Sequence, residues 1–216
     1  MKLIEQSWMW IQKPVLPLNI IELAGRTCYK SEDNITNNSS QKFVEMILKS
    51  GHESVIEHVS ASVKFITNRG VTHELVRHRL CAYSQESTRY VNYGGSDIEF
   101  IKPVWSNLKC SYYYDDPDAD PHYPTIADVD FISACCYCED SYNDLLAQGW
   151  TPQQAREVLP NALKTEIVMT ANLREWRHVF NLRTSKKAHP QIRKLMIDCL
   201  RGFKKEIPVL FDNIGD

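Results

Sequence analysis

The sequence predicts an α+β protein in which a mixed sheet packs with long helices in a single domain covering residues 1–216. Residues 57–67 alternate between apolar and polar side chains, which is typical of a half-buried strand. Residues 39–51 and the C-terminal part of the chain have the apolar spacing of helices. Because the chain has no internal repeat, low-complexity tract or obvious linker, strands and helices must share a core.

The first elements follow from side-chain periodicity. Residues 2–5 predict a short strand, and residues 39–51 predict a helix that begins at serine and ends at glycine. In the strand of residues 57–67, apolar Val59, Ala61, Val63 and Phe65 occupy alternate positions. The following "NRG" breaks this strand, and Thr72 is expected to cap a short helix that runs into Arg77.

The second half begins with a strand and is then mainly helical. Residues 97–104 predict a strand, and the polar, proline-containing stretch 106–128 predicts a long loop. One helix is expected over 130–149, and a second begins at "TPQQAREVLP", with threonine as cap and proline at the first helical position. Pro160 is expected to break it, after which 161–183 should continue as helix and 189–208 should form the last helix.

The composition argues against several classes of protein. A net charge of -2 and a pI of about 6.4 provide no general basic field for nucleic acid or membrane surfaces, so any anion site must be local. The N-terminus does not resemble a signal peptide, and no apolar stretch approaches the roughly 20 residues of a membrane span. Seven cysteines, three of them in "CCYC", do not suggest a disulfide framework, which favours a reducing, cytoplasmic setting.

Two short motifs suggest metal binding only superficially. "HELVRH" (73–78) places its histidines at i and i+5, whereas a zinc-protease helix needs them at i and i+4. The extra residue turns the second imidazole by about 100°. "CCYC" lacks a second Cys or His pair, so buried structural cysteines are expected there and no metal site is predicted.

The segment "RHRLCAYSQESTRY" (77–90) combines the chemistry of a phosphate site. Arg77 and Arg79 are permanent cations whose planar forks match phosphate oxygens, and His78 can donate or stack between them. Small donors and Arg89 follow in an expected loop, where backbone N–H groups can also bind anions. A phosphorylated ligand such as a nucleotide is therefore predicted; the alternative is a solvated, arginine-rich surface loop.

Two other segments contribute polar groups. "GHESVIEH" (51–58) is either a turn with solvated side chains or a site mouth to which Ser54 and Glu57 contribute. In "NLREWRHVFNLR" (172–183), Arg174 and His178 lie four residues apart, hence on one helical face. An exposed basic face is the alternative there, and only folding could bring Arg156 or Arg183 to the same site.

In this order, these motifs together with "AREVLP" and "NLREWRHVFNLRTSKKAHPQIRKLM" resemble the flavin-dependent thymidylate synthases. The signature of that family, Arg-His-Arg followed by seven residues and a serine, corresponds to Arg77, His78, Arg79 and Ser87. The resemblance extends from about residue 50 to 200. It implies synthesis of thymidylate from dUMP, with methylenetetrahydrofolate as one-carbon donor and FAD, reduced by NADPH, as hydride source. It also implies a homotetramer with active sites shared between subunits.

The resemblance assigns roles position by position. The implied FAD contacts are Ser54, Arg77, His78, Arg79, Gln85, Asn172, Arg174 and His178. The implied dUMP contacts are Glu74, Arg77, Gln85, Glu86, Ser87, Thr88, Arg89, Arg156 and Arg183. Arg183 is also the implied catalytic residue, because its counterpart polarises the uracil ring.

Several positions leave alternatives open. Cys81 could be imagined as a nucleophile, but the family does not require cysteine there, so we expect packing; Ser87 is expected to bind phosphate. Some family members differ at the positions of Glu74, Ser84 and Gln85. The 106–128 insertion could cover the site, contact a neighbouring subunit or do neither.

Two rival functions use the same residues. The arginines could bind a nucleotide in a module without chemistry, or the basic residues and tyrosines could bind RNA. The acidic overall balance disfavours RNA, so no nucleic-acid or membrane partner is predicted.

Overall fold

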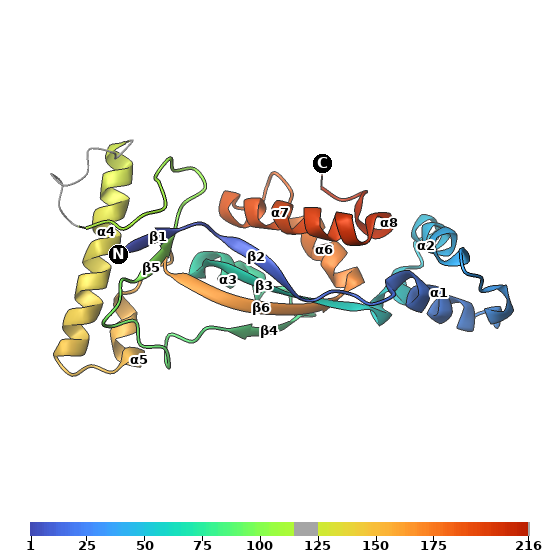
Figure 1. Cartoon of the computed structure of the whole chain (residues 1–216), viewed down its shortest axis with the longest axis horizontal. Helices are drawn as coiled ribbons and strands as arrows, with labels where there is room; N and C mark the ends of the chain where they lie inside the picture. Colours follow the sequence, from blue (N-terminus) through green and yellow to red (C-terminus); the bar gives the residue numbers. More distant parts are fainter. Residues whose placement is uncertain (115–124, 216) are drawn as a thin grey trace. The chain divides into compact units, whose positions relative to one another are not determined.

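A computed structural model describes residues 1–114 and 125–215 and contains both helices and strands (Figure 1). The strands are β1 (Lys2–Ile4), β2 (Ser7–Gln12), β3 (Ser60–Asn68), β4 (Ala82–Gln85), β5 (Glu99–Ile101) and β6 (Lys164–Asn172). The α-helices are α1 (Pro17–Thr27), α2 (Ser39–Ser50), α3 (Arg69–Leu75), α4 (Ile126–Ala147), α5 (Pro152–Ala155), α6 (Leu173–Arg183), α7 (Pro190–Glu206) and α8 (Pro208–Phe211). Short 3-10 helices are η1 (Glu32–Asn34), η2 (Glu53–His58) and η3 (Arg156–Val158). The predicted mixture of sheet and long helices is confirmed.

The chain forms two compact units, each assembled from separate stretches. Unit 1 comprises 1–7, 65–77 and 84–167, and unit 2 comprises 8–64, 78–83 and 168–216. One sheet has the strand order β2-β3-β6-β4, and β1 pairs with β5 in parallel, with Leu3 opposite Phe100. Strands β3 and β6 contain residues of both units. The assignment of 1–216 to one domain remains a prediction.

In unit 1, the core lies between the β1-β5 pair and the long helix α4 (Figure 1). Leu3 and Phe100 from the strands and Cys135 and Tyr142 from the helix are at most 2 % exposed. Of the three cysteines in "CCYC", Cys135 and Cys136 are buried as predicted, whereas Cys138 is only half-buried; all seven cysteines of the chain are free thiols. This core holds the strands and loops that present the unit 1 polar residues.

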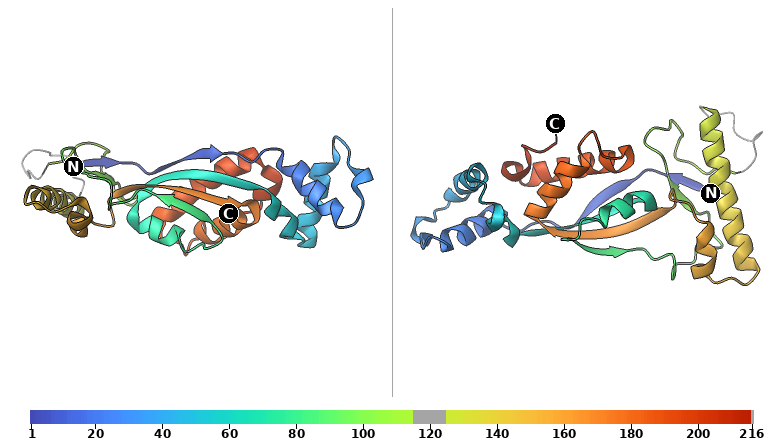
Figure 2. Two further views of the ribbon diagram at one scale, coloured as in Figure 1. Left: turned by 90° about the horizontal axis from the view of Figure 1, so that it is seen from below. Right: turned by 180° about the vertical axis from the view of Figure 1, so that it is seen from behind.

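In unit 2, an aromatic cluster fixes helix α6 against helices α7 and α8. The Trp176 ring lies 4.9 Å from that of Phe203, which in turn lies 5.0 Å from Phe180 and 5.0 Å from Phe211. The Trp176 indole N–H donates to the Ala61 carbonyl at 3.1 Å, which satisfies its one polar group. Helix α6, which presents several predicted site residues, therefore has a rigid apolar face. The same unit contains the adjacent helices α1 and α2 (Figure 2).

Several predicted elements are confirmed with small shifts of their ends. The N-terminal strand, the alternating strand and the helix of residues 39–51 correspond to β1, β3 and α2. Gly51 ends α2 with φ 69, a conformation that glycine adopts without steric cost. The predicted helices over 130–149 and 189–208 correspond to α4 and α7.

The prediction of continuous helix over 161–183 is wrong, because residues 164–172 form strand β6 and only 173–183 are helical. Along β6, Thr165, Ile167, Met169 and Ala171 are buried and their neighbours are half-buried, which is the period of a strand. Glu166, Met169 and Ala171 are also good helix formers, so the local sequence is compatible with either element. Position inside a sheet overrides such local propensity.

Four smaller predictions need correction. Asn68, not Thr72, caps α3, because its Oδ1 accepts from the Val71 N–H at 2.8 Å. The strand over 97–104 shortens to three residues, and "TPQQAREVLP" contains only the single turn α5 followed by η3. The predicted loop 106–128 ends earlier because α4 begins at Ile126, and its residues 115–124 lie outside the described residues. Strand β2 and helix α1 had no sequence prediction.

Candidate functional site

The two predicted ligand sets fall largely into different units. Unit 2 contains most of the predicted FAD set and the predicted catalytic residue, namely Ser54, His78, Arg79, Asn172, Arg174, His178 and Arg183. Unit 1 contains most of the predicted dUMP set, namely Glu74, Arg77, Gln85, Glu86, Ser87, Thr88, Arg89 and Arg156. The Arg-His-Arg motif is itself divided between Arg77 and His78.

The segment of residues 77–89 is only partly a loop. A turn over 78–81 is closed by the Cys81 N–H donating to the His78 carbonyl at 3.2 Å, and β4 then begins at Ala82. Arg77 and Arg79 are exposed, whereas His78 between them is buried. The two arginines can therefore reach a ligand in solvent, whereas the imidazole between them is enclosed by the protein.

His78 accepts a hydrogen bond from Arg183. The guanidinium Nε of Arg183, at the end of α6, lies 3.0 Å from His78 Nε2. Burial is the main cause that lowers the pKa of His78 to about 4, and the positive charge of Arg183 and the neighbouring His178 lower it further. His78 is therefore a neutral acceptor at neutral pH, and it orients the predicted catalytic arginine.

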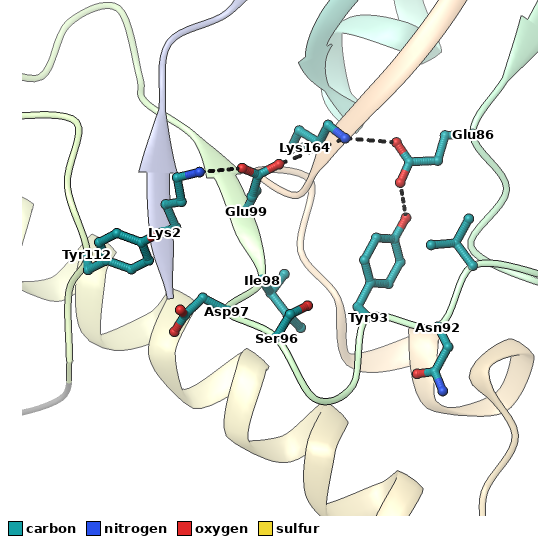
Figure 3. A pocket seen from close by; sticks show the side chains of 11 residues that line it. Lys2, Glu86, Asn92, Tyr93, Ser96, Asp97, Ile98, Glu99, Tyr112 and Lys164 are labelled. Carbon is teal, nitrogen blue, oxygen red and sulfur yellow. Dashed lines mark hydrogen bonds and ion pairs between the residues drawn. The ribbon is translucent and has the colours of Figure 1, made fainter.

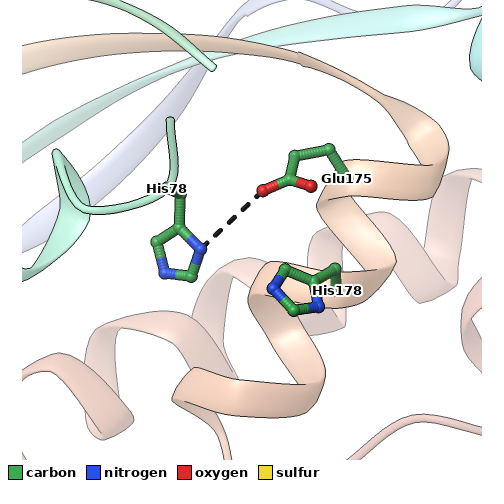
Figure 4. A group of neighbouring side chains, drawn as sticks. All are labelled: His78, Glu175 and His178. Atoms are coloured by element: carbon green, nitrogen blue, oxygen red, sulfur yellow. Dashed lines mark ion pairs between the residues drawn. The ribbon is translucent and has the colours of Figure 1, made fainter. Parts of the chain in front are cut away.

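Glu175 and His178 complete a cluster around His78 (Figure 4). Glu175 Oε1 lies 3.8 Å from His78 Nδ1, and the rings of His78 and His178 are 5.9 Å apart at an interplanar angle of 75°. Cys81 Sγ lies 4.0 Å from the same Glu175 oxygen. Burial raises the pKa of Cys81 to about 11, and Glu175 contributes to the rise. A thiol with that pKa is a weak nucleophile at neutral pH, which agrees with a packing role.

The three side chains of His78, Glu175 and His178 lie close enough to hold a metal ion, a grouping that the sequence did not predict. The hydrogen bond from Arg183 argues against this use. A neutral imidazole that accepts at Nε2 has its proton on Nδ1, so the nitrogen facing Glu175 has no lone pair for a metal. The adjacent guanidinium would also repel a cation. The cluster is better described as a hydrogen-bonding and electrostatic assembly.

Ser54 and Arg174 line a common pocket of about 340 Å³ in unit 2. Ser54 lies on η2 and Arg174 on α6, and both are exposed. The Arg174 guanidinium contacts the Glu57 carboxylate at 2.5 Å and lies 3.9 Å from Glu53. "GHESVIEH" is thus a short 3-10 helix whose glutamates hold Arg174 at the pocket wall. Its Ser54 lines the pocket, and the contribution of Ser54 and Glu57 to a ligand site stays a prediction.

Asn172 has a structural role in the described chain. It is the N-cap of α6, and its Oδ1 accepts from the Glu175 N–H at 2.8 Å. Such a cap stabilises a helix by about 1 kcal/mol. Asn172 therefore fixes the beginning of the helix that presents Arg174, His178 and Arg183, and contact with FAD remains a prediction.

Gln85 is anchored between two hydroxyl groups of unit 1. Its Nε2 lies 3.0 Å from Thr72 Oγ1 and 3.2 Å from Thr165 Oγ1. Thr72 and Thr165 are both fully buried. The amide orientation is thereby fixed, and the half-buried Gln85 has a defined position at the end of β4.

Glu86 lines a pocket of about 440 Å³ in unit 1 (Figure 3). It accepts from the Tyr93 hydroxyl at 2.9 Å and pairs with Lys164 Nζ at 3.4 Å. Lys164 also contacts Glu166 at 3.0 Å. Burial by itself lowers the pKa of Lys164. The hydrogen bond to Glu166 and the negative charge of Glu86 raise it by more, so the pKa of Lys164 is above its ordinary value. The Glu86 carboxylate is therefore positioned by a dense charge network.

The remaining unit 1 residues form a compact turn after Glu86. Ser87 Oγ accepts from the Arg89 N–H at 3.3 Å, and the Ser87 carbonyl accepts from two N–H groups further along the turn. Thr88 is buried and its hydroxyl accepts from Arg156 at 3.4 Å, while exposed Arg89 lies over the Tyr90 ring. Glu74 is half-buried near the end of α3. The structure thus brings Thr88 and Arg156 together across 68 positions of sequence.

Sequence reasoning missed several supporting residues. Glu175 contacts His78, Thr72 and Thr165 hold Gln85, and Lys164 pairs with Glu86. A signal existed for Glu175, because it lies three residues before His178 and so shares a helical face with it. The other three come from distant segments, and no local pattern connects them to the site.

Among the described residues, no helix is both long and apolar enough to cross a membrane.

Comparison with known proteins gives concordant results. The family model described as thymidylate synthase complementing protein matches residues 11–209. The chain is 36% identical over 208 residues to a flavin-dependent thymidylate synthase of Mycolicibacterium gilvum, covering 90% of this chain and 78% of the relative. It is 33% identical over 208 residues to the flavin-dependent thymidylate synthase of Geobacter sulfurreducens, covering 92% and 82%.

The fold also matches a solved structure. A UMP/dUMP methylase, PolB from Streptomyces cacaoi, crystallised with 5-Br dUMP, aligns with a TM-score of 0.77 at 22% identity, covering 98% of this chain and 96% of that chain. At that identity the likeness supports the fold alone. With the ordered motifs, the family match and the curated relatives, the chain belongs to the flavin-dependent thymidylate synthase family of enzymes.

Proposed function

We propose that this enzyme makes thymidylate from dUMP, using methylenetetrahydrofolate as one-carbon donor and FAD reduced by NADPH as the source of hydride. The observation that supports this most directly is the 3.0 Å hydrogen bond from Arg183 to His78. It joins the C-terminal arginine to the Arg-His-Arg motif, the two features by which the sequence most resembles the family. A module that only bound nucleotides would not need a buried neutral imidazole to orient this arginine.

The chemistry of the unit 2 residues suits a flavin dinucleotide. The Arg174 guanidinium and the Ser54 hydroxyl, both at the wall of the 340 Å³ pocket, are typical phosphate ligands. That volume suits one part of a dinucleotide, not the whole. Arg77, His78, Arg79, Asn172, Gln85 and His178 are proposed as the other FAD contacts. When bound, FAD supplies the hydride, and the protein orients it.

The unit 1 turn is proposed to hold dUMP. Ser87 and the exposed Arg89 would bind its phosphate, and the anchored Gln85 amide would meet the base. Glu74, Glu86, Thr88 and Arg156 are the other proposed contacts. Two of these, Thr88 and Arg156, already contact each other, so the turn is largely preorganised.

Arg183 is proposed to stabilise negative charge that develops on the uracil ring. A guanidinium is a permanent cation, and the neutral His78 acceptor holds it without neutralising it. We expect Arg183→Ala to lower kcat about 10²- to 10³-fold, the typical cost of removing one donor at a developing charge. The matched control is Arg201→Ala, because Arg201 is 70% exposed and pairs with Asp198 on α7.

The deciding experiment starts with the purified protein. It should be yellow and release FAD on denaturation, and thymidylate formation from dUMP and methylenetetrahydrofolate should require NADPH. If FAD binds but no thymidylate forms with all substrates supplied, the module without chemistry is the better description. If RNA binds tightly and FAD does not, the proposal fails. Replacing NADPH by NADH tests the pyridine-nucleotide preference.

The proposed assembly is a homotetramer with active sites shared between subunits. Light scattering of the purified protein measures the mass against the 25.0 kDa chain. The Arg183→Ala variant and the double variant Ser87→Ala/Arg89→Ala should each have low activity alone. Mixing them should raise the activity if the residues that they lose belong to one site and come from different subunits. Absence of any restoration after subunit exchange would contradict a shared site.

A further inference from the structure

The buried carboxylate of Glu175 has no role in the residue assignments above. Glu175 is 7% exposed and lies in the first turn of α6, where the helix dipole favours a negative charge. Its oxygen faces Nδ1 of His78 at 3.8 Å, and the opposite ring nitrogen accepts from Arg183 at 3.0 Å. The three residues therefore form a line from carboxylate to imidazole to guanidinium, all within unit 2.

The hydrogen bond at one ring nitrogen decides what the other can do. Because Arg183 can only donate, His78 Nε2 must be unprotonated, and the single ring proton must reside on Nδ1. The low pKa of His78 is consistent with this neutral form. A carboxylate on the Nδ1 side favours that tautomer over the alternative. At 3.8 Å the contact is longer than a hydrogen bond, so its present effect is electrostatic.

We propose that Glu175 is a positioning residue for Arg183, acting through His78 by holding its Nδ1–H tautomer so that Nε2 accepts from the guanidinium. The expected effect on turnover rests on the proposed function, whereas the effect on the His78 tautomer does not. In the other tautomer, Nε2 would carry a proton pointing at the Arg183 N–H, and the two donors would repel each other. Arg183 would then lose the hydrogen-bond acceptor that His78 provides.

The surroundings of Glu175 agree with this role. The Cys81 thiol points at the same carboxylate oxygen from the turn after the Arg-His-Arg motif. The Tyr83 hydroxyl donates to the His78 carbonyl at 3.1 Å, which restrains the backbone of the same residue. The side chains of residues 78–83 are therefore arranged around one imidazole orientation, and the carboxylate of Glu175 lies beside the Nδ1 edge of that ring.

The first test measures the tautomer directly, without any ligand or turnover. Protein labelled with ¹⁵N at histidine is examined by two-bond ¹H–¹⁵N correlation spectra, and His78 is assigned with His78→Gln. The wild type should show His78 as the Nδ1–H tautomer. Glu175→Ala should shift His78 toward a mixture of tautomers. In Glu175→Gln, the fraction of His78 in the Nδ1–H tautomer should lie between those of Glu175→Ala and the wild type. The matched control is Glu22→Gln, since Glu22 is also a buried glutamate of unit 2, paired with Arg26.

The second test connects the tautomer to turnover. We expect Glu175→Ala to lower kcat about 10- to 100-fold with little change in the KM for dUMP, because a misplaced catalytic group costs this much. Glu22→Gln should lower stability without changing the His78 spectrum or kcat.

Each result has a defined meaning. If His78 is the Nε2–H tautomer in the wild type, or if its tautomer is unchanged in Glu175→Ala, the inference is overturned. It is also overturned if the tautomer changes while kcat does not. If the wild type forms no thymidylate at all, the proposed function fails, and the tautomer spectra still decide whether Glu175 controls His78.

Discussion

Protonation of His78 should make this protein less stable in mild acid. Its pKa is about 4 in the folded chain against 6.5 for an unperturbed histidine, because burial disfavours the charged ring and Arg183 and His178 repel it. Well above pH 6.5 the ring is neutral in both states, so the contribution to stability is complete. As the pH falls from 6.5 toward 4, only the unfolded chain takes up the proton, and stability is lost.

The magnitude follows from the two pKa values. One pKa unit corresponds to about 1.4 kcal/mol, so the loss from pH 6.5 to about 4 is about 3 kcal/mol. His78 is only 6% exposed, so solvent screening reduces this value little. The charged groups that face the ring are Arg183 at Nε2, Glu175 at Nδ1 and His178 at its edge.

The assay is urea unfolding of the wild type and His78→Gln at one protein concentration, from about pH 7 to about pH 4.5. Glutamine can still accept from Arg183 but cannot titrate, so the free energy of unfolding of this variant should fall less steeply with acid. The control is His58→Gln, which removes an exposed histidine and should keep the wild-type slope. Equal slopes for the wild type and His78→Gln would refute the reasoning.

Three further substitutions test other parts of the structure. Gln85→Leu removes the amide that donates to two buried threonine hydroxyls, so the free energy of unfolding in urea should fall by about 1–3 kcal/mol. Calorimetry should also show weaker dUMP binding. Unchanged stability would contradict the anchoring role. Ser87→Ala should raise the KM for dUMP and leave residual turnover, whereas complete loss of turnover at saturating dUMP would argue for a role beyond phosphate binding. Gly202→Ala would place a Cβ 2.2 Å from the Trp8 ring and should destabilise by about 1–3 kcal/mol, measured by thermal unfolding; a stability equal to that of the wild type would show that Trp8 moves aside freely.

Much of the secondary structure could be predicted because periodicity is a local property. The alternation of Val59 to Phe65 and the serine-to-glycine helix of residues 39–51 depend on side chains close in sequence, and both elements form as predicted. Strand β6 was missed because its residues also suit a helix, and only a place between β3 and β4 makes the strand favourable. The N-cap of α3 was misplaced for a similar reason: Asn68 and Thr72 are both good caps, and the backbone decides which is used.

The sequence by itself determined which chemical groups are available. The spacing of Arg77, His78, Arg79 and Ser87, followed at a distance by Arg174 and Arg183, was sufficient to indicate the family, because motif order is a property of the chain. The tertiary structure alone decided how those groups interact. It buried His78 and left its neighbours exposed, and it placed Arg183 against one ring nitrogen and Glu175 near the other. The protonation state of an imidazole depends on burial and on nearby charges, and residues separated by about a hundred positions come together only when the chain folds.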